Sequence, residues 1–168
     1  MTATDAIELK EIDAASPQKQ SCRTLMAKPR ITRVRRAGVD HQVVTVEGGN
    51  RTTYQRQPCP RCPWRVDATG EFPAEAFRHS AGTAEDMATH TFACHTTGTA
   101  KPAVCAGFLL RNSRNNLGVR LMIHRGDLDP SAITDGGHEL HESYLAMAVA
   151  NGLDPADPAL ARCRADNE

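Results

Sequence analysis

Residues 57–65, Gln-Pro-Cys-Pro-Arg-Cys-Pro-Trp-Arg, restrict the fold more than any other part of the chain. Proline fixes its own backbone φ angle and has no N–H to donate, so three prolines in nine residues exclude a regular helix or a central strand. The segment must form a tight loop, and this loop carries Cys59 and Cys62 as a C-x2-C pair. A turn of this kind directs two sulfur atoms toward one point, as metal sites require.

A second pair of cysteines completes the pattern. Cys94 follows Cys62 after 31 residues, and ten residues separate it from Cys105. We therefore expect Cys59, Cys62, Cys94 and Cys105 to bind a metal ion together. The second pair is spaced more widely than in zinc fingers, and His95 is an alternative nitrogen ligand in place of either distal cysteine. Burial as a small apolar side chain is a competing interpretation for Cys105.

Zinc is the favoured metal for this site, because structural zinc accepts a broad range of ligands. A [4Fe-4S] or [2Fe-2S] cluster is the alternative, since four cysteines suit it as well. A thiol redox site of the C-P-x-C form is a weaker alternative. Its first cysteine must follow a strand and begin a helix in a βαβ unit, and no such pattern surrounds Cys59.

The residues around the loop favour thiolate ligands. Backbone N–H groups two and three residues after a cysteine commonly donate to its sulfur, and none of these positions is a proline here. Four thiolates on a divalent ion leave a negative charge, which nearby arginines can offset. These are Arg56, Arg61 and Arg65. Cys105 is expected in the first turn of a helix that begins at Pro102, where the helix dipole favours a thiolate.

The 168-residue length suits one domain, which we place at residues 26–165, after a flexible tail at residues 1–25 that holds Cys22. No apolar run approaches the roughly 20 residues that span a bilayer, and the polar N-terminus lacks the apolar region of a secretory signal. We therefore expect no membrane contact and a cytoplasmic location. Cytoplasmic thiols are usually reduced, so the six cysteines favour metal ligation over disulfides.

The pattern predicts an α+β fold with an N-terminal β-meander, a metal-clamped cysteine centre and a helical C-terminal half. Strands are expected at residues 31–35 and 41–46 and a third at residues 51–55. Helices are expected at residues 73–79, 102–111, 117–126, 138–150 and 159–162, and a further turn is expected to open at the Thr83–Asp86 capping box.

Charge is distributed unevenly along the chain. Residues 19–65 hold 11 Lys and Arg but only two acidic residues, Asp40 and Glu47. This basic segment can bind nucleic acid or a regulatory or host protein, or it can pack against the acidic second half of the chain. If it binds nucleic acid, Arg33, Arg35 and Arg36 on the first strand are the candidate contacts.

No catalytic motif is recognisable in the sequence. His138-Glu139-Leu140-His141 differs from the H-E-x-x-H metalloprotease string because its histidines are three residues apart instead of four. We interpret it as the solvated start of a helix. The chain is therefore expected to be a binding or regulatory module, with an iron–sulfur or thiol redox protein or sensor as the alternative.

Four short strings resemble an uncharacterised cysteine-rich family that occurs in actinobacteria and in their phages and prophages. They are Pro58–Arg65, Gly70–Pro73, Phe92–His95 and Cys105–Phe108. The resemblance covers about residues 55–165 and leaves out the basic N-terminal segment. It implies a cysteine-rich core at Cys59, Cys62, Cys94 and Cys105, and it carries no established activity.

Overall fold

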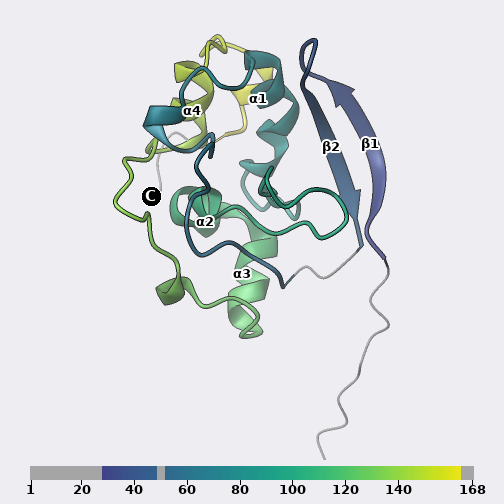
Figure 1. Ribbon diagram of the computed structural model, residues 1–168, viewed down its shortest axis with the longest axis vertical. Helices are drawn as coiled ribbons and strands as arrows, with labels where there is room; N and C mark the ends of the chain where they lie inside the picture. Colours follow the sequence, from purple (N-terminus) through teal and green to yellow (C-terminus); the bar gives the residue numbers. More distant parts are fainter. Residues whose placement is uncertain (1–27, 49–51, 164–168) are drawn as a thin grey trace, which may run out of the picture.

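The computed structural model describes residues 28–48 and 52–163, and within them the chain folds as α+β (Figure 1). Six regular elements are present there: β1 (Arg30–Arg36), β2 (Gln42–Glu47), α1 (Ala74–Ser80), α2 (Ala106–Asn112), α3 (Leu117–His124) and α4 (Tyr144–Ala150). Short 3-10 turns lie at Val66–Ala68, Ala81–Thr83, Ser113–Asn115, Pro130–Ala132 and Pro158–Leu160. None of the helices in this part of the chain has the length and apolar character to cross a membrane.

The N-terminal sheet is a two-stranded antiparallel hairpin. Both predicted strands are confirmed, and the Ala37 N–H donates to the His41 carbonyl at 2.9 Å to close the turn between them. The predicted third strand is wrong, so the sheet is not a meander. Arg51 lies outside the described residues, and Tyr54 makes only an isolated parallel bridge to Val104 because it joins the cysteine-bearing segments instead of the hairpin.

Two predicted helices are confirmed closely by α1 and α3. The start of α3 depends on Asn116, whose side chain is fully buried. Its Oδ1 accepts from the Val119 N–H at 3.0 Å, as an N-cap should. Its Nδ2 donates to the carbonyls of Thr83 and His90, so one side chain ties α3 to two loops.

Two other helices begin later than predicted, and two further helical predictions were wrong. The helix predicted from Pro102 begins only at Ala106, because residues 103–105 pair as extended chain and Cys105 is the N-cap. The helix predicted from His138 begins at Tyr144, where the Ser143 hydroxyl accepts from the Ala146 N–H. The capping box at residues 83–86 opens no helix, and the last predicted helix is a 3-10 turn.

The core is centred on Trp64, which is fully buried. Its ring makes edge-on contacts with Phe92, Phe108 and Tyr144, at centroid distances of 6.1, 6.1 and 6.0 Å. These three rings come from the extended segment before Cys94, from α2 and from α4. The residue that follows the C-x2-C-P string is therefore the point where the helical half packs onto the loop.

Gly107 allows α2 to approach Trp64 closely. A Cβ atom at this position would lie 2.5 Å from the Trp64 Cβ and 2.8 Å from its Cγ. We expect Gly107→Ala to lower the free energy of unfolding by about 2 kcal/mol, because overpacking of about 3 kcal/mol exceeds the helix-propensity gain of up to about 1 kcal/mol. Urea unfolding followed by circular dichroism measures this.

Gly82→Ala is the matched control for that substitution. No heavy atom lies within 4 Å of a Cβ at Gly82, which also lies in a short helical turn. This variant should be as stable as the wild type or slightly more stable. Equal losses in the two variants would show that the contact between α2 and Trp64 is not what excludes a side chain at Gly107.

Candidate metal centre

The loop that carries the first cysteine pair consists of two consecutive turns. The Cys62 N–H donates to the Cys59 carbonyl and the Arg65 N–H donates to the Cys62 carbonyl, both at 2.9 Å. The Trp64 N–H also donates to the Cys62 sulfur, as the sequence predicts. The prolines lie between these donors and remove none of them. The loop is therefore rigid and aims Cys62 into the core beside Trp64.

The second cysteine pair is brought to the loop by extended segments that meet at Val104. This residue bridges Ala93 in antiparallel fashion and Tyr54 in parallel fashion. The Cys94 N–H donates to the Ala103 carbonyl at 2.7 Å, and the Cys105 N–H donates to the Phe92 carbonyl at 2.9 Å. Backbone pairing therefore places both cysteines beside the loop.

The four predicted cysteines lie in one continuous cluster. The Cys62 and Cys105 sulfur atoms are 3.5 Å apart, and those of Cys59 and Cys94 are 3.9 Å apart. Cys59 and Cys62 also interact through their side chains and so connect the two pairs. All four are free thiols. The predicted grouping of Cys59, Cys62, Cys94 and Cys105 thus has a counterpart in the structure.

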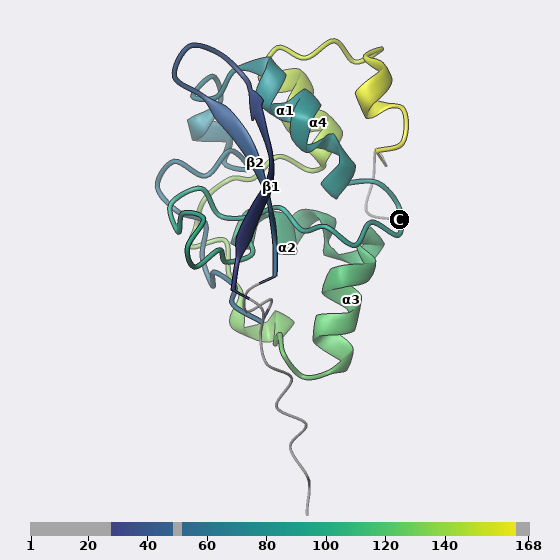
Figure 2. The same cartoon turned by 90° about the vertical axis from the view of Figure 1, so that its right-hand side faces the viewer.

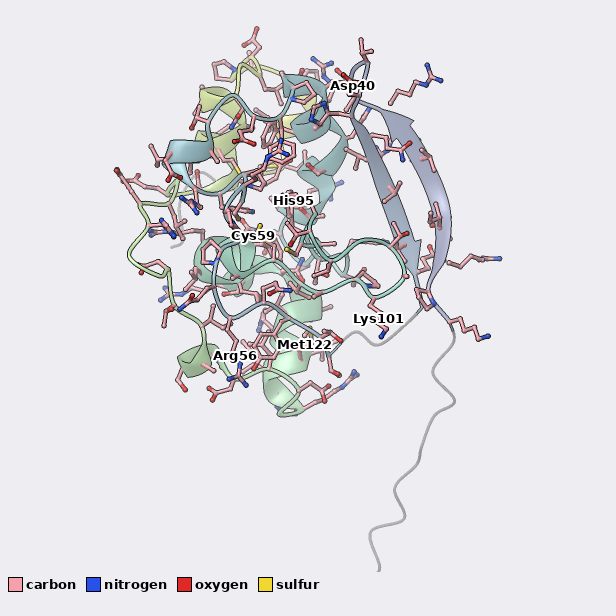
Figure 3. All side chains as sticks on the ribbon, in the orientation of Figure 1. Asp40, Arg56, Cys59, His95, Lys101 and Met122 are labelled. Atoms are coloured by element: carbon pink, nitrogen blue, oxygen red, sulfur yellow. The ribbon has the colours of Figure 1, made fainter. Side chains whose placement is uncertain are left out.

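His95 lies at the edge of this cluster, on the side that faces solvent. Its Nδ1 atom is 3.8 Å from the Cys59 sulfur, and the labelled Cys59 and His95 side chains lie close together near the middle of the molecule (Figure 3). Cys62, Cys94 and Cys105 are buried, whereas Cys59 is half-buried and His95 is exposed. The cluster therefore has a closed side in the core and an open side at Cys59.

Mutual hydrogen bonding and burial raise the pKa values of Cys59, Cys62 and Cys94. A hydrogen bond with Cys105, together with burial, raises the pKa of Cys62 to about 12. The pKa values of Cys59 and Cys94 are raised mainly by their bonds to Cys62 and to Cys59 respectively. A reactive redox cysteine has a lowered pKa, so these shifts disfavour the thiol redox interpretation.

The arginines near the loop are engaged with carboxylates. Arg61 pairs with Glu71 and Arg65 pairs with Asp67. Arg65 also lies close enough for the charges of Cys59 and Cys62 to raise its pKa, after the larger effect of Asp67. The sequence predicted that Arg56, Arg61 and Arg65 offset the charge of the thiolates. Among the described residues, Arg65 is placed to do so.

One contact at the cluster was missed by sequence reasoning. The Cys94 sulfur lies 3.1 Å from the Thr96 hydroxyl, and the Thr96 N–H donates to the same sulfur. The available signal was the position of Thr96 two residues after a cysteine, where a backbone donor to sulfur is expected.

Cys163, the fifth cysteine of the described residues, takes no part in this cluster. The Cys163 thiol donates to the Ala81 carbonyl at 3.5 Å, and burial raises its pKa to about 11. Cys22 and the predicted tail at residues 1–25 lie outside the described residues.

The prediction that His138 to His141 open a helix was wrong. The Val66 N–H donates to the Glu139 carbonyl at 3.0 Å, and the His141 N–H donates to the Trp64 carbonyl at 2.9 Å. This extended pairing replaces a helix turn there, so the two histidines do not share a helix face. The His141 Nε2 atom instead lies 3.1 Å from the Thr69 hydroxyl.

A clamped metal centre is not evident from the side-chain positions themselves. Within residues 28–48 and 52–163, no set of three or more His, Cys, Asp or Glu side chains has an arrangement that could hold a metal ion. The sulfur atoms are grouped as two close pairs joined through Cys59 and Cys62. The structure therefore shows a thiol cluster, and metal binding by it is a hypothesis.

Comparison with known proteins identifies one family. A family of unknown function, DUF6283, matches residues 54–164. The match includes all four clustered cysteines and begins after the β1–β2 hairpin. No curated protein and no solved structure matches the chain.

Proposed function

The chain belongs to the DUF6283 family of unknown function, and we propose that its domain is a small zinc-binding module with Cys59, Cys62, Cys94 and Cys105 as the ligands. The supporting observation is the pair of sulfur–sulfur distances, 3.5 and 3.9 Å. Ligands about 2.3 Å from a tetrahedral zinc ion are about 3.8 Å from one another. Both cysteine pairs are thus already near the spacing that zinc requires.

The chemistry of the donor set also favours zinc. Four sulfur donors without a carboxylate suit zinc or an iron–sulfur cluster better than magnesium or calcium. A cluster inserts iron and sulfide between its cysteine ligands, which requires the sulfur atoms to be farther apart than direct contact. Contact distances in both pairs therefore favour a single ion, and the iron–sulfur protein remains the second candidate on ligand type alone.

Zinc in this position would have a structural role. It would join the loop at residues 57–65 to the segments at residues 92–105, which come together around Trp64 and Val104. The described cysteines are free thiols, which agrees with the reducing cytoplasm that we propose as the location. The module would act by binding a partner through the basic segment 19–65, and we propose no enzymatic activity for it.

Elemental analysis and a visible spectrum of the full chain, purified without oxygen, test this proposal. We expect about one zinc per chain and no visible absorption, as for a closed four-cysteine site. Cys62→Ala should lose the metal. Cys163→Ala should keep it, because this thiol bonds to a backbone carbonyl outside the cluster.

His95→Ala decides between the two ligand sets. Zinc retained in this variant supports four cysteine ligands, and zinc lost supports His95 as a ligand in place of one distal cysteine. Iron with acid-labile sulfide in the wild type would refute the zinc proposal and support the iron–sulfur protein instead. A wild-type chain that takes up neither metal after reconstitution would refute both.

A further inference from the structure

The β1–β2 hairpin is an addition to the family domain. It ends at Glu47, before the family match begins at Tyr54. β2 lies between β1 and the body of the molecule, so β1 is the outermost strand (Figures 1 and 2). The hairpin is anchored by the buried Ala37 and by the His79 side chain, whose Nε2 lies 3.0 Å from the Arg36 carbonyl.

The arginines of β1 differ from those of the family domain in their partners. Arg61, Arg65, Arg78 and Arg162 all form ion pairs with carboxylates. None of the ion pairs found among the described residues involves an arginine of β1. Arg61 and Arg65 belong to the basic segment 19–65, and their partners Glu71 and Asp67 belong to the acidic second half. Pairing of the basic segment with the acidic half of its own chain therefore accounts for Arg61 and Arg65, but not for the arginines of β1.

Three of the four β1 arginines are available to a partner. Arg30, Arg33 and Arg36 are exposed, whereas Arg35 is only half-exposed and its Nε atom is buried. Nitrogen-ended side chains extend from β1 away from the body of the molecule (Figure 3). Arg33 and Arg36 were predicted as contacts from the sequence, Arg30 was missed, and Arg35 is the least suitable of the set.

The spacing of these cations fits a linear polyanion. Arg30 and Arg36 begin and end a strand that rises about 3.3 Å per residue, so the three cations extend over about 20 Å. The register places Arg30 and Arg33 on one face of the hairpin and Arg36 on the other, so they lie on both sides of its outer edge. A duplex presents one phosphate of each strand for about every 3.4 Å of its helix axis, so about six phosphates of a strand fall within this length of axis. Of the acidic residues of the hairpin, Asp40 lies at its turn, and Glu47 lies opposite Arg30 in the register without an ion pair to it among the described residues.

Duplex DNA fits the hairpin better than other nucleic acids. Single-stranded nucleic acid is usually bound by aromatic rings that stack on bases, and β1 and β2 contain no Phe, Tyr or Trp. The major groove of B-form DNA is about 12 Å wide and admits a two-stranded ribbon, whereas the deep, narrow major groove of RNA helices does not.

We propose that β1 binds duplex DNA by contacting its phosphates with Arg30, Arg33 and Arg36. This contact carries no base specificity, because phosphate contacts fix position and do not read sequence. The proposal does not depend on metal binding, since the hairpin contributes no ligand to the cysteine cluster.

Fluorescence anisotropy of the full chain with a labelled duplex of about 20 base pairs tests the proposal over a salt titration. The slope of log K against log salt is about −0.9 for each phosphate contact, so the triple variant R30Q/R33Q/R36Q should have a slope smaller by about 2.7. Three contacts alone account for about a 40-fold loss of wild-type affinity between about 50 and about 200 mM salt. The triple variant should lack that component.

The matched control is R114Q/R120Q/R125Q, which removes the same charge from three exposed arginines in α3, in the 3-10 turn before it and at its C-cap. Circular dichroism and zinc content should be unchanged in both triple variants, which separates loss of the fold or of the metal from loss of DNA contact. Affinity and slope retained in the control and reduced in the hairpin variant would support the proposal.

Three results would overturn it. The first is that the wild type does not bind the duplex at low salt, and the second is that the two triple variants lose affinity equally. The third is that the wild type binds an acidic polypeptide or an anionic lipid vesicle as tightly as duplex DNA, or more tightly. The last result would identify β1 as a general cationic surface or assign it to another partner. A preserved DNA contact in a chain that binds no metal would leave this proposal intact while refuting the zinc proposal.

Discussion

Replacing Trp64 with alanine should lower the free energy of unfolding by about 4 kcal/mol, among the largest losses expected from a single side chain here. Trp64 is fully buried and contacts three aromatic rings from separate parts of the chain. Its removal leaves a cavity that those rings cannot fill, because each is held by its own backbone segment. Urea unfolding followed by circular dichroism measures the loss.

Trp64→Phe separates packing from hydrogen bonding at this position. The Trp64 Nε1 atom is buried and has no hydrogen-bond partner among the described residues. Substitution by phenylalanine therefore removes no hydrogen bond, and it keeps most of the contacts with the neighbouring rings. We expect it to cost well under half of the alanine loss, at about 1 kcal/mol. A phenylalanine variant as unstable as the alanine variant would show that the indole N–H has an essential partner.

The sequence predicted the cysteine cluster because its evidence is local. Prolines around Cys59 and Cys62 require a tight loop, and a C-x2-C turn places both thiols on one side of it. The remaining two ligands were predicted from the spacing of the cysteines and from the family resemblance, and the structure places both beside the loop. The sequence did not reveal the pairing through Val104, because the bridges of residue 104 to residues 54 and 93 depend on the tertiary fold.

The predicted starts of two helices were wrong for the same reason. His138 to His141 has a helical pattern, but its backbone pairs with Trp64 and Val66 of the loop. Pro102 is a good first-turn residue, yet Ala103 and Cys105 are held in extended pairing with residues 92–94. In both places a long-range backbone contact to the cysteine-bearing segments prevented a locally favoured helix. Where no such contact competes, as in α1 and α3, the pattern predicted the helix correctly.

Withdrawing zinc should lower the melting temperature of the chain by about 15 °C. A ligand that binds only the folded state, at a concentration about 1,000 times its dissociation constant, stabilises that state by about 4 kcal/mol. The melting temperature of a domain of this size changes by a few degrees for each kcal/mol. The effect should be smaller than in zinc-finger peptides, which unfold without metal, because the Trp64 core and the Val104 pairing remain. Thermal unfolding of the full chain with zinc or with a strong chelator measures it.

Cys62→Ala and Cys163→Ala make this prediction specific to the cluster. Cys62→Ala should melt at one temperature with and without zinc, close to that of the metal-free wild type, because it lacks a ligand. Cys163→Ala should keep the full zinc-dependent shift, since Cys163 bonds to the Ala81 carbonyl and not to another thiol. If the wild type melts identically with zinc and with chelator, the four thiols serve the fold only as small buried side chains. A shift retained in Cys62→Ala would instead place the stabilising zinc elsewhere in the chain.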